Sequence, residues 1–273
     1  MFHDYQFNRM VNKNRGDLPR LYLFERLRNR YRRNRALLFE RKLHKLKPAN
    51  PYISFTFDDF PQSAYLIGGT ILKKYGIRGT YYTSLGLMGK ESPVGRIFSL
   101  KELRDLVTDG HELGCHTYDH LDAWETNLDS FEKSILRNRE ALKSILPQVY
   151  FATFSYPREE PHPMIKRIAG TYFVCCRGGG QTLNSGMIDL NLAKSCFIDS
   201  VNGETLSSLK ILINKNKVEK GWLIFSTHDI CMNPSRFGCG PDYFEDIVRY
   251  AANSGAVILP VCEVYSQIYG DKQ

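Results

Sequence analysis

The chain has 273 residues, of which 42% are apolar and 24% are charged, enough for one sizeable hydrophobic core and an extension. Its formal net charge of +8 is unevenly placed, because residues 1–50 hold 14 Lys and Arg against 4 Asp and Glu while the remainder holds 23 against 25. The sequence starts with no charged-apolar-small leader and contains no apolar run of about 18 residues. These two features argue against export by a signal peptide and against a membrane-spanning helix.

The basic arm, residues 1–49, is predicted to form an amphipathic helix that starts near Asp17 and Pro19 and ends before Pro48. Its apolar residues share one face and arginines surround the rest: Leu21, Phe24, Leu27, Tyr31 and Leu38, with Arg26, Arg28, Arg30, Arg32, Arg33 and Arg35. Such a helix fits contact with anionic lipid headgroups. Alternatively, the apolar face packs on the rest of the protein or on a second subunit, and the arginines are solvated. Nucleic-acid binding is not favoured, because the arm contains no recognised reading motif.

From residue 50 onward, short apolar runs alternate with helical patterns. Strands are predicted at residues 52–57, 79–84, 112–115, 150–154, 171–175, 195–198, 222–226 and 256–259. Helices are predicted at residues 61–75, 99–109, 127–145, 161–168, 203–214 and 241–253, with a capping box of Ser99 and Glu102 at the second. This alternation indicates a parallel sheet in one domain, residues 50–273.

Two adjacent carboxylates, Asp58 and Asp59, follow the first predicted strand of this domain. Neighbouring residues on an extended chain point to opposite sides, so one carboxylate could hold a metal while the other handles a proton. Asp-Asp followed closely by proline is also ordinary turn chemistry that caps a helix. Other strand ends decide between these two interpretations.

Two histidines, His116 and His120, follow the strand at 112–115, and one helical turn would align their rings. Two neutral imidazoles and one carboxylate form a ligand set that suits a divalent metal, especially Zn²⁺. Histidines at this spacing also occur on solvated helices. A third strand, 222–226, leads to His228, and the carboxyl ends of parallel strands meet on one side of a sheet. The sequence therefore predicts one site that contains the aspartates and the three histidines.

With these residues in view, the chain resembles the polysaccharide deacetylase family, also called the NodB-homology or carbohydrate esterase family 4 domain, from about residue 50 to 262. Residues 56–59 match its T-F-D-D motif, residues 116–120 match H-[ST]-x-x-H, and residues 225–228 match the late leucine-x-histidine motif more loosely. The order and spacing of the motifs also agree. The resemblance implies an irregular (β/α) barrel of about seven strands, here with a basic N-terminal helical extension.

Carried over by position, the resemblance implies that Asp59, His116 and His120 hold a divalent metal, with Zn²⁺ favoured over Co²⁺, Ni²⁺ or Mn²⁺. It also implies that Asp58 is the general base and His228 the general acid. A metal lowers the pKa of a water molecule and polarises a carbonyl group, so this set could hydrolyse an N-acetyl group and release acetate. His111 and Glu112, by contrast, are expected to fix their loop by hydrogen bonds.

The third family motif, R-x-x-P-Y or R-P-P-Y, is the point of departure. The corresponding stretch, residues 154–159, keeps Pro157 but lacks the arginine that orients the catalytic aspartate, and Arg158 stands where an aromatic residue is expected. The backbone N–H of Arg158 is expected to donate a hydrogen bond to the oxyanion of the reaction. Arg177, at the end of another apolar strand, could supply the missing charge to Asp58, or it could be an exposed residue of a glycine-rich turn. For the fourth motif, Asp199 and Lys194 are the only candidates.

The expected substrate is an N-acetylated amino sugar in a glycan or in a lipid-linked or nucleotide-linked precursor. The seven cysteines are odd in number and lack paired C-x-x-C spacing, which indicates free thiols and a reducing, cytoplasmic location. Together with the basic arm, this favours a position at the inner face of the membrane. Two other function classes stay open: a hydrolase of C–N bonds in non-sugar substrates, and a catalytically silent glycan-binding protein. The presence of both Asp58 and His228 argues against a protein that binds glycans without catalysis.

Overall fold

A computed structural model describes residues 18–158, 160–200 and 202–270, with side chains from residue 27 onward. The helices are α2 (Leu18–Leu38), α3 (Thr70–Lys74), α4 (Leu100–Thr108), α5 (Leu128–Ile145), α6 (Pro163–Tyr172), α7 (Leu206–Glu219), α8 (Pro241–Ala252) and α9 (Val261–Tyr269), with a π-helical turn at Ala64–Gly69 and a 3-10 turn at Leu85–Leu87. The strands are β1 (Leu43–Leu46), β2 (Tyr52–Phe57), β3 (Thr80–Thr83), β4 (Glu91–Ser92), β5 (Gly95–Arg96), β6 (Glu112–Cys115), β7 (Thr153–Ser155), β8 (Cys175–Arg177), β9 (Gly186–Asp189), β10 (Cys196–Phe197), β11 (Trp222–Thr227) and β12 (Val257–Ile258).

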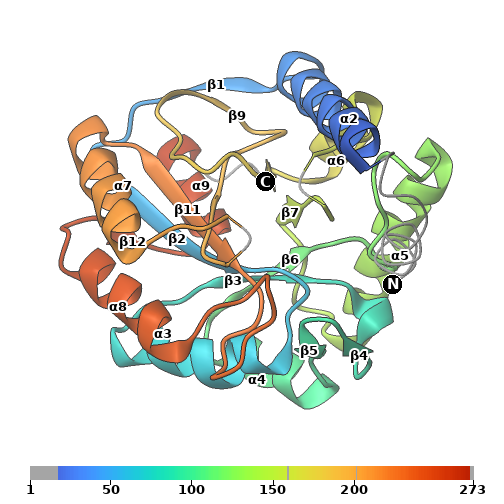
Figure 1. The fold of residues 1–273 in the computed structure, drawn as a ribbon. Helices are drawn as coiled ribbons and strands as arrows, with labels where there is room; N and C mark the ends of the chain where they lie inside the picture. Colours follow the sequence, from blue (N-terminus) through green and yellow to red (C-terminus); the bar gives the residue numbers. More distant parts are fainter. Residues whose placement is uncertain (1–17, 159, 201, 271–273) are drawn as a thin grey trace.

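The central sheet is parallel throughout and forms an irregular, open (β/α) barrel. Its strand order is β10-β11-β2-β3-β6-β7-β8, and β12 pairs with the first residues of β2. A parallel bridge between Arg177 and Ala193 links β8 to the chain that leads into β10. Helices α3, α4, α5, α7 and α8 surround these strands in Figure 1. The seven-strand irregular barrel predicted from the family resemblance is thereby confirmed.

Most predicted elements form close to their expected bounds. Ser99 caps α4 and makes the predicted capping box with Glu102. The strand predicted at 171–175 is displaced, because α6 continues to Tyr172 and β8 begins at Cys175. The predicted helix at 61–75 contains a π-helical turn before α3. Strands β1 and β9 and helix α9 were not predicted from the sequence, because they are short or lack a clear hydrophobic period.

Side chains alternate between the two faces of the sheet, and this alternation positions the functional groups. In β2, Ile53, Phe55 and Phe57 belong to the large core beneath the surrounding helices. Tyr52 belongs to a second, smaller core on the inner face, which also includes Trp222, Val261 and Tyr265. Ser54 and Thr56 continue the inner row and are fully buried. The inner face is therefore apolar at the start of the strands and polar at their carboxyl ends.

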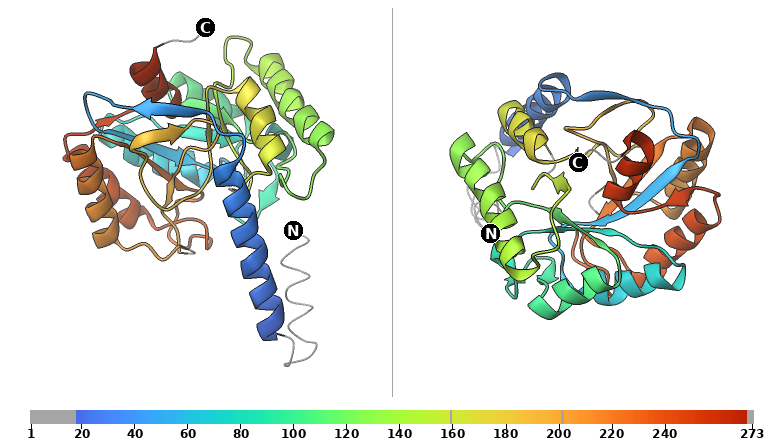
Figure 2. Two further views of the ribbon diagram at one scale, coloured as in Figure 1. Left: turned by 90° about the horizontal axis from the view of Figure 1, so that it is seen from above. Right: turned by 180° about the vertical axis from the view of Figure 1, so that it is seen from behind.

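The N-terminal helix α2 projects beyond the barrel on one side (Figure 2, left). It ends at Leu38 rather than near Pro48, and the chain then forms β1, which pairs antiparallel with β9. Fully buried Lys166 of α6 joins the end of α2 to β9, because its ammonium group donates to the carbonyls of Ala36 and Phe39 and pairs with Asp189. The division at residue 49 stays a prediction.

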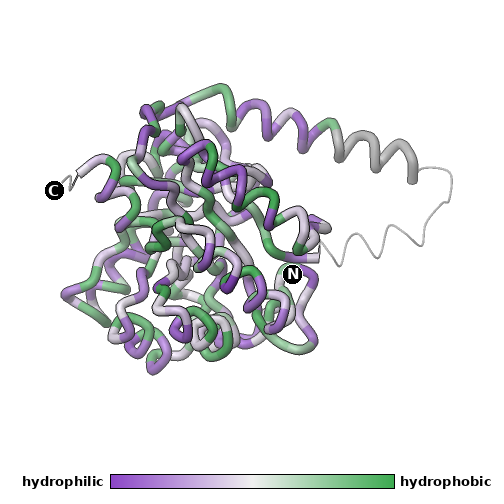
Figure 3. The backbone as a smooth tube through the Cα atoms, turned by 90° about the vertical axis from the view of Figure 1, so that its left-hand side faces the viewer, coloured by the Kyte–Doolittle hydropathy of each residue, from purple (hydrophilic) through white to green (hydrophobic). Residues whose placement is uncertain are grey.

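The apolar residues of the arm do not cover the barrel. Leu27 and Leu38 are 57% and 66% exposed, and only Tyr31 contacts the barrel, with its ring 6.2 Å from that of Trp124. Packing of this face on the same chain is therefore confined to Tyr31 among the described residues. Leu21 and Phe24 lie outside the region of described side chains. Figure 3 shows polar and apolar residues mixed along the projecting helix. Within the described residues, none of the helices has the length and apolar character needed to cross a bilayer.

Candidate metal and catalytic site

The polar end of the inner face brings together residues from five strands. Asp58 continues the inner row of β2, and His116 and His228 do the same beyond β6 and β11. Ser155 and Arg177, the last residues of β7 and β8, are register partners. The predicted site residues other than Arg158 thus converge because parallel strands end on the same side.

Asp59, His116 and His120 form a compact group whose possible ligand atoms all lie within 4.8 Å of one another. The Nε2 atoms of His116 and His120 are 3.6 and 3.2 Å from Asp59 Oδ1. That oxygen is buried and makes no hydrogen bond with a described residue. An oxygen acceptor buried between two imidazole nitrogens without a bonded donor fits a metal-binding position.

The tautomer of His116 also fits metal binding. Its Nδ1 lies 2.7 Å from the carbonyl oxygen of Ser155, which can only accept, so Nδ1 carries the proton and Nε2 presents its lone pair to Asp59. Burial lowers the pKa of His116 to about 4, which keeps the ring neutral. Burial by itself would raise the pKa of Asp59, but His120, His228 and His116 together hold it below its ordinary value. The three residues are therefore suited to a divalent cation.

The spacing of the two histidines suggested one helical turn, but they do not lie on a helix. They stand on an irregular loop after β6, and Thr117 and His120 have positive φ angles of 59° and 54°. The ring centroids are nevertheless 5.0 Å apart. Asp59 and Arg158 also have positive φ angles, of 60° and 63°. Left-handed backbone is unfavourable for such residues, and clusters of it are typical of functional sites.

Asp58 has a different partner, Arg177. Its carboxylate forms an ion pair with the Arg177 guanidinium through Oδ1, while Oδ2 accepts a 3.4 Å hydrogen bond from Ser226. Arg177 is 1% exposed and also donates to the hydroxyls of Ser155 and Ser195. Burial opposes ionisation of Asp58, but Arg177, followed by His116 and His228, brings its pKa below the ordinary value.

Sequence reasoning named Arg177 but missed the three serines that hold the pair. For two of them the signal was the alternation of side chains: Ser155 lies two residues beyond the inward Thr153, and Ser226 lies two residues beyond the inward Ile224. Asp58 and Asp59 thus have different partners, and neither of them caps the helical segment that follows. Ser63, at the start of the π-helical turn, makes no side-chain capping bond either.

His228 is held by the loop that follows β11. Its Nδ1 is 3.2 Å from the carbonyl oxygen of Phe237 and its ring packs beside the Phe237 ring. Buried Asp229 fixes this loop by accepting hydrogen bonds from the backbone N–H and the hydroxyl of Ser235. With Nδ1 occupied as the donor to Phe237, Nε2 is the nitrogen free to face a substrate.

The remaining candidates lie further from this group. The Arg158 side chain is turned toward Asp122, with its Nε 3.4 Å from the carboxylate, so only its backbone could serve the site. Asp199 bonds to Asn202, and Lys194 is exposed. His111 and Glu112 fix their loop as expected: His111 Nδ1 accepts from Gly79 N–H, and Glu112 accepts from the hydroxyls of Thr80 and Thr153.

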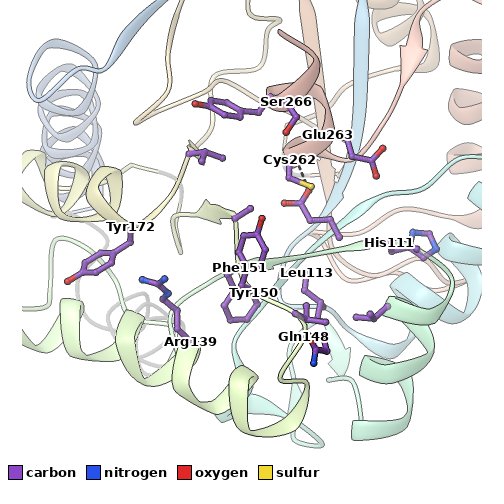
Figure 4. A pocket seen from close by; sticks show the side chains of 17 residues that line it. His111, Leu113, Arg139, Gln148, Tyr150, Phe151, Tyr172, Cys262, Glu263 and Ser266 are labelled. Carbon is purple, nitrogen blue, oxygen red and sulfur yellow. Dashed lines mark hydrogen bonds between the residues drawn. The ribbon is translucent and has the colours of Figure 1, made fainter. Parts of the chain in front are cut away.

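A pocket of about 710 Å³ lies at the other end of the sheet, where β6 and β7 begin. Figure 4 shows Arg139, Tyr150, Tyr172, Cys262 and Glu263 around it. None of the predicted site residues lines this pocket. It is therefore separate from the candidate site.

Comparisons with known proteins agree with this geometry. The family model described as polysaccharide deacetylase matches residues 45–169, a range that contains the aspartate pair and both histidines. None of the curated proteins matches the sequence significantly. Several solved structures share the fold at low sequence identity.

Three of these structures illustrate the similarity. A family 4 acetyl xylan esterase from Clostridium thermocellum, in complex with a cobalt ion, is 20% identical over 79% of this chain and 90% of that one, with a TM-score of 0.55. The Bc1960 peptidoglycan N-acetylglucosamine deacetylase is 15% identical over 84% and 92%, with a TM-score of 0.56. A family 4 carbohydrate esterase from Streptomyces lividans, in complex with acetate, is 16% identical over 78% and 93%, with a TM-score of 0.51.

The family match therefore coincides with the residues that build the Asp-His-His group. Taken together, these findings show that the chain belongs to the polysaccharide deacetylase family, the carbohydrate esterase family 4 or NodB-homology domain.

Proposed function

We propose that this protein is a metal-dependent hydrolase that removes the acetyl group from an N-acetylated amino sugar in a glycan or glycan precursor. The observation that carries the proposal is the pairing of two groups at one strand end: Asp59 with two histidines, and Asp58 with Arg177. A metal-binding set beside an ionised carboxylate can activate a water molecule for the hydrolysis of an unreactive amide. Asp59, His116 and His120 would hold the ion, which we propose to be Zn²⁺.

Each residue of the proposed mechanism has one role. The bound metal would make a water molecule more acidic and the acetyl carbonyl more electrophilic. Asp58, kept ionised by Arg177, accepts the water proton at Oδ2, whose hydrogen bond from Ser226 is long at 3.4 Å. The backbone N–H of Arg158 donates to the oxyanion that develops on the carbonyl oxygen. His228 donates a proton from Nε2 to the departing sugar nitrogen, so that the amine leaves neutral and acetate remains.

We further propose that the arm makes peripheral contact with an anionic membrane. Leu27, Leu37 and Leu38 are exposed, and they share the helix with Arg30 and other arginines. Exposed apolar side chains among cations are the combination that binds lipid headgroups. Such contact would bring the enzyme to lipid-linked glycans.

A cytoplasmic location at the inner membrane face is proposed on separate grounds. All seven cysteines are free thiols, and five of them are buried. Free thiols persist in a reducing compartment. Fractionation of cells that produce the full chain would test this location.

The proposed activity is tested by acetate release and bound-metal analysis. The substrate panel contains N-acetylated nucleotide sugars, lipid-linked glycans, chitin-like oligomers and acetylated xylan. Asp58→Asn should lower the rate on the best substrate by roughly 10²- to 10⁴-fold while metal content stays unchanged. Asp119→Asn is the matched control, because this exposed carboxylate beside His120 bonds to Ser134 and not to the site. Normal release by Asp58→Asn would overturn the base assignment, and no release from any substrate would overturn the activity.

A further inference from the structure

A small pocket lies between the N-terminal arm and the loops that carry the site. Its volume is about 240 Å³, and it is lined by residues of α2, of the segment 122–125 and of the segment that follows Pro157. Arg28 and Arg32 come from α2, and Trp124 and Arg158 come from the loops. We call it the arm pocket. Its cationic side chains are mixed with acidic ones, so the pairing of the charges decides what the pocket can bind.

Each acidic residue of the arm pocket already has an arginine partner. Arg32 pairs with Glu125, and the Arg32 guanidinium also lies 5.2 Å from the centre of the Trp124 ring. The other two acids pair in the same way: Asp122 with Arg158 at 3.4 Å, and Glu160 with Arg33 at 2.7 Å. Each of the three carboxylates that line the pocket is therefore paired with an arginine.

Two N–H donors of the arm pocket remain without an acceptor. Arg28 Nε and the indole Nε1 of Trp124 are both buried, and neither makes a hydrogen bond with a residue in the described part of the chain. Arg28 also forms no ion pair with a described carboxylate. A buried donor without an acceptor is unfavourable, and two of them around one cavity call for a ligand with several acceptor oxygens.

We propose that the arm pocket binds an oxyanion carried by the substrate, with Arg28 and Trp124 as its donors. The chemistry fits the phosphate of a phosphate-linked amino sugar, and it also fits the carboxylate of an acidic sugar beside the reacting one. This inference rests on the proposed function for the identity of the substrate, but not for the existence of the anion site.

The position of the arm pocket suits a neighbouring part of the same substrate. Asp122 stands two residues after His120, so their Cα atoms are at most about 7 Å apart along the chain. Arg158 is both the proposed oxyanion donor and part of the pocket wall. A sugar whose acetyl group reaches the metal-binding residues would therefore place its next substituent toward α2. The arm would act as one wall of the substrate cleft.

Binding of inorganic pyrophosphate to the full chain tests the site without any turnover. Calorimetry measures affinity, and tryptophan fluorescence reports on Trp124, because the other tryptophan, Trp222, is fully buried in the inner core. Arg28→Gln should weaken binding by roughly ten- to a hundred-fold. Arg30→Gln, an exposed arginine on the same helix, is the matched control and should bind as the wild type does. Asp59→Asn should also retain binding, which separates the arm pocket from the metal-binding residues.

Kinetics then distinguish the two sources of the oxyanion. Three substrates are compared: an N-acetylglucosaminyl phosphate, an N-acetylglucosaminyl uronate and neutral diacetylchitobiose. Arg28→Gln should raise KM for the anionic substrate that is used and leave that of the neutral one unchanged. Equal pyrophosphate binding by Arg28→Gln and Arg30→Gln, or loss of binding in Asp59→Asn alone, would overturn the inference. Pyrophosphate binding without acetate release from any substrate would instead support the anion site and refute the proposed activity.

Discussion

Replacement of Arg177 by methionine is the sharpest test of how the aspartate pair is supported. The guanidinium is 1% exposed, and its partner Asp58 is 5% exposed, so the variant leaves a buried carboxylate without its counter-charge. Breaking one partner of a buried ion pair destabilises a protein by about 3–5 kcal/mol. For a domain of this size, that corresponds to a fall in Tm of roughly 6–20 °C. The hydroxyls of Ser155 and Ser195 also lose a charged donor.

The effect on activity follows from the same contact. Burial opposes ionisation of Asp58, and Arg177 is the largest of the influences that lower its pKa. Without Arg177, the pKa of Asp58 should rise, so the acidic limb of the pH–rate profile should move to higher pH. Arg177→Lys should recover part of the stability, because it keeps the charge but loses the two-nitrogen fork.

Thermal unfolding and pH–rate profiles of wild type and both variants measure these effects. Arg249→Met is the matched control, because Arg249 pairs with Asp246 on the surface and is 59% exposed. An exposed pair of this kind contributes less than about 1 kcal/mol. If Arg177→Met loses no more stability than the control and keeps the wild-type pH profile, Arg177 does not support Asp58.

Three further predictions concern other parts of the molecule. Asp59→Asn should lower bound metal well below one ion per chain in elemental analysis, and wild-type metal content in this variant would contradict the ligand assignment. Burial lowers the pKa of His111 to about 4 from 6.5, so its stabilising contribution is complete above pH 6.5 and is lost as the pH falls toward 4. Urea unfolding at pH 5 should therefore show about 2 kcal/mol less stability than at pH 7 from this residue, and His111→Gln should lack that part of the change. Leu27→Glu with Leu38→Glu should abolish sedimentation with phosphatidylglycerol vesicles, whereas Ile211→Glu, at an equally exposed site on α7, should not; equal binding by all variants would exclude the arm as the contact.

The barrel and the converging residues could be predicted because their signals are local. Each of the strands β2, β6 and β11 is a short apolar run with a polar residue directly after it, and parallel strands bring such residues together. The capping box at Ser99 was equally local. Arg177 was named correctly as a neighbour of Asp58, because β8 ends on the same side of the sheet as β2.

The features that escaped prediction depend on contacts distant in sequence. The pairing of β1 with β9 joins residues more than a hundred positions apart, and nothing in residues 43–46 alone distinguishes a strand from the end of a helix. The backbone of the histidine loop is set by its surroundings: Thr117 accepts a hydrogen bond from Leu121 N–H while holding a left-handed φ. The spacing of four therefore indicated a shared site correctly but gave the wrong conformation.

The left-handed residues at the strand ends have a consequence for engineering. Thr117 is β-branched, fully buried and held at a φ of 59°, a conformation that disfavours its side chain. The polypeptide thus stores conformational energy beside its reactive groups, where thermostability and turnover are expected to compete. A library selected only for heat resistance should accumulate glycine or asparagine at this position. The catalytic efficiency of such clones would measure how much of the enzyme's performance depends on that stored energy.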